Sequence, residues 1–89
     1  DGSDHGWGSH HFVMGGAVKP RTWVGALPAM SVSEGADNVG GGRLLPAIGV
    51  DQHGATLARW MGVRDDQMST VLPNIGEYTT RDLDFFKPA

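Results

Sequence analysis

Hydrophobic residues follow two kinds of pattern along the chain, and the change falls at Asp51. Before it, apolar residues form short runs, at 12–18 and 44–49, between glycine-rich polar stretches. Such runs favour β-strands. An interior glycine pair in the first run indicates a bulge or a close backbone approach, and Pro46 favours an edge position in the second. Segment 31–43, rich in glycine, is expected to be a long loop.

After Asp51 the apolar positions recur at helical spacing, which predicts a helix near 51–61. Asp51 is its expected N-cap and Gly62 its expected C-terminal cap. One face of this helix carries Val50, Gly54, Leu57, Ala58 and Met61.

A second helix is predicted near 65–72, with Asp65 as its cap and Pro73 at its end. Its apolar side is formed by Met68, Val71 and Leu72. The tail, 73–89, carries further apolar residues that we expect to dock at a place the sequence does not fix: Leu83, Phe85 and Phe86. The expected fold class is therefore α/β, with short strands, a long glycine-rich loop and then two helices.

Composition limits the size of the core. Only 39% of the 89 residues are hydrophobic, and 14 are glycine, which buries no side chain. A chain this small usually needs an additional source of stability, and the absence of cysteine excludes disulfides. A metal, self-association or a missing partner segment remain. Because the chain lacks an initiator methionine, we expect a piece of a longer protein or a processed product.

Charge and hydropathy exclude two classes of partner. The formal net charge is −3, and the seven basic residues are scattered, whereas nucleic-acid binding needs a clustered basic face. No apolar stretch approaches the ~20 residues of a membrane span. We therefore expect neither nucleic acid nor membrane as a partner.

Candidate chemistry gathers in residues 1–11, where three of the four histidines lie close to a carboxylate. Asp4, His5, His10 and His11 carry the side-chain types that bind Zn²⁺ or Mn²⁺, with copper or iron as alternatives. His10 and His11 precede the first predicted strand, so their side chains should point to opposite faces. We favour His10 over His11 as a ligand.

Two stretches together resemble a known family. Asp4-His5-Gly6, then His10, then an apolar run ending in Gly-Gly-Ala-Val-Lys, is similar to the C-terminal half of the alkaline phosphatase-like superfamily. Within it the chain most resembles the DUF1501 family, which is secreted and bacterial. The stretch from Val50 to Val63 resembles the helix that follows in both groups, and Pro73-Asn74-Ile75-Gly76 resembles the end of DUF1501 chains. The similarity covers about residues 1–78.

The resemblance implies the C-terminal part of an α/β sandwich whose metal centre cleaves phosphate or sulfate esters. Asp4 and His5 would bind one ion, and His10 or His11 a second. It also implies a secreted or periplasmic location and a small ester or anion as substrate. The superfamily's nucleophile lies upstream of this chain, and neither Ser9 nor Thr22 matches its position, so no catalytic residue is assigned.

The remaining polar and aromatic residues have simpler explanations. His53, in the first turn of its helix, is expected to be solvated, and the acid pairs Asp65/Asp66 and Asp82/Asp84 to be helix-start and surface charges. The three tryptophans, Trp7, Trp23 and Trp60, are expected to supply core area rather than an aromatic binding wall.

Three functions follow. The first is a metal-binding fragment of an ester hydrolase, divided into a metal-type loop (1–11), strands and loop (12–50), helices (51–72) and tail (73–89). The second is a non-catalytic fragment that self-associates, as a homo-oligomer, or binds a partner such as a missing N-terminal half. The third is a copper- or iron-dependent oxidoreductase.

Overall fold

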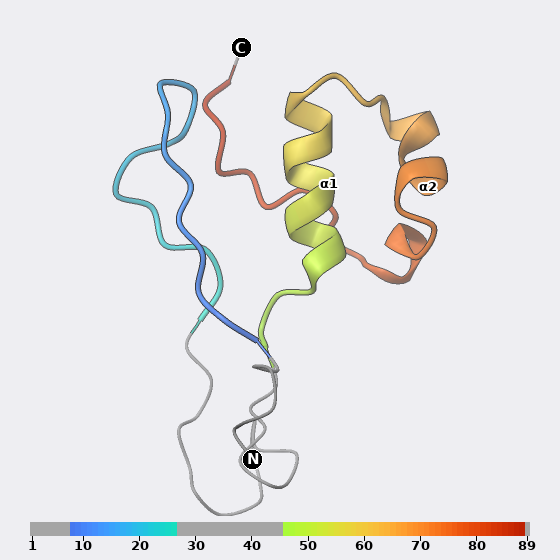
Figure 1. Cartoon of the computed structure of the whole chain (residues 1–89), viewed down its shortest axis with the longest axis horizontal. Coiled ribbons are helices and arrows are strands. Elements are labelled where there is room, and N and C mark those ends of the chain that lie inside the picture. Colours follow the sequence, from blue (N-terminus) through green and yellow to red (C-terminus); the bar gives the residue numbers. More distant parts are fainter. Residues whose placement is uncertain (1–7, 27–45, 89) are drawn as a thin grey trace, which may run out of the picture. The chain divides into compact units, whose positions relative to one another are not determined.

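The computed structural model describes residues 8–26 and 46–88. These residues belong to two compact units. One unit includes 8–12, 25–26 and 46–47, and there Gly8 lies so close to Pro46 that an added Cβ would stand 2.9 Å from the proline Cγ. The other unit includes 13–24 and 48–88 and contains both labelled helices, α1 and α2 (Figure 1).

The longest element is α1, Val50–Trp60. It ends as a helix followed by glycine commonly does: the Gly62 N–H donates to the Arg59 carbonyl at 3.1 Å, and the Val63 N–H to the Ala58 carbonyl at 3.0 Å. Gly62 adopts φ +106°, a conformation that L side chains rarely adopt, so the expected role of Gly62 as C-terminal cap is confirmed.

The N-terminus of α1 differs from the expectation. The N-cap is Gly49 rather than Asp51, which lies in the first turn. Glycine has no side chain to accept a backbone N–H, so only half of a capping box is present: the Gln52 Oε1 accepts the Gly49 N–H at 2.9 Å. The Asp51 carboxylate still suits the positive end of the helix dipole.

Three short elements follow α1: the 3₁₀-helix η1 (Asp65–Gln67), the helix α2 (Met68–Val71) and the 3₁₀-helix η2 (Ile75–Glu77). They return the chain to α1 and form a small core in which Ala55, Met68 and Ile75 are buried. The helix predicted at 65–72 is therefore split, and the N-cap of its first part is Arg64, not Asp65.

The apolar face predicted for α1 is confirmed only in part, since Ala58 packs against the core. Ala55 is buried, whereas Val50 and Met61 are 81% and 77% exposed. The reason is that the core partners, Met68 and Ile75, are supplied on the Ala55 side of the helix. On α2, Met68 is buried as expected, but Val71 is half exposed.

The C-terminal segment, 80–87, is held along α1 by a stripe of polar residues spaced i, i+4, i+7 (Figure 1). The Gln52 Nε2 donates to the Thr80 carbonyl at 2.7 Å. The Thr56 hydroxyl accepts the Leu83 N–H at 2.9 Å and donates to the Gln52 carbonyl at 2.8 Å. Arg59 pairs with the Asp82 carboxylate at 2.8 Å. These contacts fix the place of the tail that the sequence left open.

The first predicted strand, 12–18, is not a strand in the described residues. Its last residue forms one isolated antiparallel bridge, Val18 with Phe86. Two hydrogen bonds flank the bridge, from the Lys19 N–H to the Phe85 carbonyl at 2.9 Å and from the Lys87 N–H to the Ala17 carbonyl at 2.7 Å. Gly15, at φ +157°, and a turn from Gly15 to Val18 interrupt the run before it reaches the bridge.

The second predicted strand, 44–49, lies only partly within the described residues. Residues 46–49 have no strand there, and they lead directly into α1.

Gly49→Ala tests the close approach at the start of α1. An added Cβ would lie 2.7 Å from two carbons of the Tyr78 ring, so the ring or the helix start must move. We expect the free energy of unfolding to fall by about 1–3 kcal/mol in urea titrations followed by circular dichroism. Gly76→Ala is the matched control, because nothing lies within 4 Å of its added Cβ; it should change stability by less than about 0.5 kcal/mol. Equal effects of the two would contradict the packing described.

Thr56→Val tests the hydroxyl that joins α1 to the C-terminal segment. The valine preserves shape but leaves the Leu83 N–H without its acceptor, which should cost about 1–3 kcal/mol of unfolding free energy. Thr56→Ser keeps the hydroxyl and loses one buried methyl, worth about 0.8 kcal/mol. Chemical denaturation of both variants should therefore rank valine as the more damaging; the opposite order would show that packing, not the hydrogen bond, matters at this position.

Candidate functional site

The predicted metal ligands are divided by what the structure describes. Asp4 and His5 lie outside the described residues, whereas His10 and His11 lie in the extended start of 8–12 and are both exposed. Among residues 8–26 and 46–88, no group of three His, Cys, Asp or Glu side chains is close enough to hold a metal ion. A site with three or more ligands that uses His10 or His11 must therefore draw at least one ligand from outside these ranges.

His53 belongs to α1 and is half-buried. Its ring lies 5.9 Å from the Phe85 ring, centroid to centroid, with an interplanar angle of 38°. His53 is thus in contact with the buried part of the C-terminal segment rather than fully solvated as expected.

The acidic residues of the C-terminal segment have structural contacts. Asp82, expected to be a surface charge, is half-buried, pairs with Arg59 and accepts the Asp84 N–H at 2.8 Å. That hydrogen bond accompanies a positive φ of 58° at Asp84, whose carboxylate lies 3.0 Å from the Lys19 ammonium. These carboxylates hold the segment in place.

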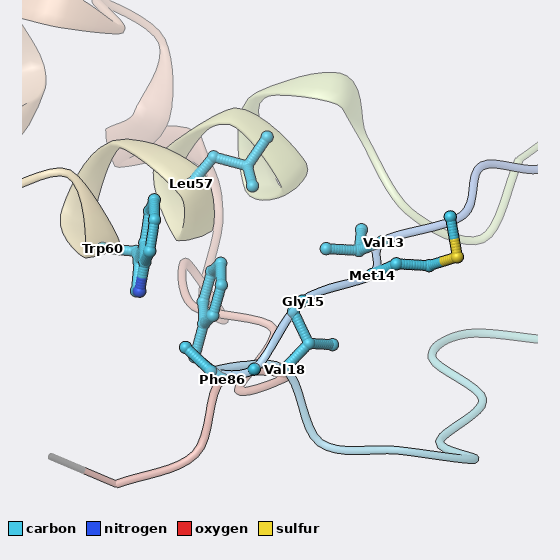
Figure 2. A pocket seen from close by; sticks show the side chains of 9 residues that line it. Val13, Met14, Gly15, Val18, Leu57, Trp60 and Phe86 are labelled. Atoms are coloured by element: carbon cyan, nitrogen blue, oxygen red, sulfur yellow. The ribbon is translucent and has the colours of Figure 1, made fainter.

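An apolar pocket among the described residues is large enough for a ligand group. It has a volume of about 330 Å³ and lies between segment 13–18, α1 and the C-terminal segment (Figure 2). No charged side chain lines it; its walls come from Val13 to Val18, Leu57, Trp60 and Phe86. Pockets of this size and polarity take apolar side chains or rings.

Aromatic rings build one wall of the pocket. Trp60 on α1 stacks on Phe86, with centroids 5.2 Å apart and an interplanar angle of 9°. Phe86 also contacts Phe85 at 4.9 Å, and Phe85 is buried. The Val18–Phe86 bridge sets the position of Phe86, and the hydrogen bond from Leu83 to Thr56 sets the direction of the segment that carries it.

The tryptophans do not supply a core in the described residues. Trp60 is 58% exposed and Trp23 is 68% exposed, and Trp7 lies outside the described residues. The expectation of core tryptophans is therefore wrong for Trp23 and Trp60, and Trp60 instead lines the pocket beside Phe86. The i, i+3 spacing of Leu57 and Trp60 places both residues on one face of the helix, which could have indicated this pocket wall. The contribution of Phe86 could not be predicted, because it depends on where the C-terminal segment lies against α1.

Comparison of the chain with protein-family models, curated proteins and solved structures gives no match. Among the described helices, none has both the length and the apolar character needed to cross a bilayer.

Proposed function

We propose that residues 4–11 supply metal ligands to an ester-hydrolysing centre of the alkaline phosphatase-like type, acting on phosphate or sulfate esters. The observation that carries this proposal is the placement of Asp4, His5, His10 and His11 within eight positions of a glycine-containing segment. Little chain entropy is lost when ligands so close in sequence converge on one ion.

The donor set fits a divalent metal in type. One carboxylate and up to three imidazoles are ligands that Zn²⁺ and Mn²⁺ accept, and copper or iron would accept them as well. His10 and His11 are both exposed. Such a metal, when bound, would supply Lewis acidity toward a phosphoryl or sulfuryl oxygen.

The residues of this chain would bind and orient; they do not include an assigned nucleophile. Thr22 donates its hydroxyl to the Pro20 carbonyl at 3.2 Å in an exposed turn, which gives it no base to activate it. Since the nucleophile of the resembled superfamily lies upstream of the matched residues, this segment alone is expected to bind metal without turning over substrate.

A copper- or iron-dependent oxidoreductase uses the same donors. Because Cu²⁺ binds most nitrogen and oxygen sites more tightly than Zn²⁺ or Mn²⁺, the activity of the metal-loaded protein separates the two functions better than affinity does. Phosphatase or sulfatase activity with Zn²⁺ or Mn²⁺ supports the hydrolase. Oxidase activity with copper, and no phosphatase or sulfatase activity in a chain that includes the upstream residues, would contradict it.

Calorimetric titration of the 89-residue chain with Zn²⁺, Mn²⁺ and Cu²⁺ tests the ligands. His5→Ala should weaken binding by at least about tenfold, because it removes a ligand. His53→Ala is the control, since His53 packs against Phe85 on α1, and it should leave the metal affinity within about twofold. Affinity should also fall as the pH drops below about 6.5, because protonated imidazole cannot bind a metal. No binding, or equal losses in the two variants, would remove the metal proposal.

A further inference from the structure

The pocket has an apolar side chain on its own rim that does not fill it. Met14 contributes to the lining, yet it is 91% exposed, and its side chain extends away from Trp60 and Phe86 (Figure 2). Methionine is flexible and apolar, which suits insertion into an irregular apolar site. The same surface thus presents both a cavity and a projecting group of a size to enter it.

Such a surface is complementary to itself. In a two-fold dimer each contact occurs twice, so the Met14 of each copy can enter the pocket of the other. The charges beside the pocket leave room for this arrangement. Lys19 and Asp84 flank the Val18–Phe86 bridge as an ion pair, and the exposed Lys87, next to Phe86, adds one positive charge per copy. Salt screens a single exposed charge of this kind, so the dimer is expected to depend on apolar burial and not on charge pairing.

The available apolar area approaches what a dimer needs. A large aromatic side chain offers up to ~250 Å². At 58% exposure Trp60 leaves well over half of its surface to a partner, and Met14, at 91%, leaves nearly all of its own. With the pocket walls these give on the order of 400 Å² of apolar surface per copy. A standard interface buries about 800 Å² per partner, of which somewhat more than half, about 450 Å², is apolar.

We propose that the pocket lined by Val13–Val18, Leu57, Trp60 and Phe86 binds the Met14 side chain of a second copy of this chain, forming an isologous dimer. Solvent leaves the Trp60–Phe86 wall when the dimer forms, and Met14 gains the aromatic neighbours that it lacks in its own copy. Sulfur–aromatic contacts add to the gain from apolar burial. This inference is independent of the metal proposal and concerns other residues.

Sedimentation velocity across micromolar concentrations, with a chelator present so that metal-bridged association is excluded, is the test. The parent chain should show a saturating monomer–dimer equilibrium. Met14→Gln should weaken the dimer by at least about tenfold. Met61→Gln is the matched control, since Met61 is 77% exposed but does not line the pocket, and it should change the dissociation constant by less than about twofold.

Three results would overturn the proposal. The first is a chain that stays monomeric at every concentration. This result overturns the proposal even if the pocket of the monomer binds an apolar dye. The second is a dimer that the two methionine substitutions affect equally or not at all. The third is open-ended association, because an isologous contact closes at two copies. Circular dichroism of Met14→Gln should match the parent spectrum, which an exposed position allows.

Discussion

The hydroxyl of Thr56 is the contact on which the described arrangement of the larger unit depends. It is buried in the middle of α1, where it donates within its own helix and accepts the N–H of Leu83, 27 positions further along the chain. This one group therefore joins the only long helix of the described residues to the segment that carries Phe85 and Phe86. Because Thr56 is buried and Leu83 is half-buried, losing the bond leaves a partly buried N–H without its acceptor.

The distribution of apolar residues explains why a polar contact carries so much weight. The buried side chains of this unit are few, and among the described residues its buried apolar members are Ala55, Met68, Ile75 and Phe85. Each large buried side chain contributes about 1.5–3 kcal/mol, so one hydrogen bond is a substantial share of the whole. The larger apolar groups, Met14 and Trp60, lie on the surface instead and are available to a partner.

The sequence predicted what local rules control. Helical spacing after Asp51 and the glycine at position 62 were sufficient to place α1 and its C-terminal cap, since both depend on residues within two turns. The buried face of α1 was not predictable from that spacing, because distant residues decide which side is covered. The strand expected at 12–18 needed a partner strand of similar length. The C-terminal segment pairs with it at one position only, the bridge between Val18 and Phe86. For the proposed metal site, the sequence shows which side-chain types are present. Whether these side chains come close enough to bind one ion depends on the tertiary structure, which the sequence pattern does not predict.

Native-state hydrogen exchange at the Leu83 amide tests the central contact most directly. Leu83 lies in a segment without regular secondary structure, so only the bond to Thr56 protects its N–H. We expect the Leu83 amide to exchange through the same opening as the amides of α1, with comparable protection. Exchange at the rate of an unstructured peptide, while α1 remains protected, would show that the C-terminal segment is not held to the helix and would contradict this account.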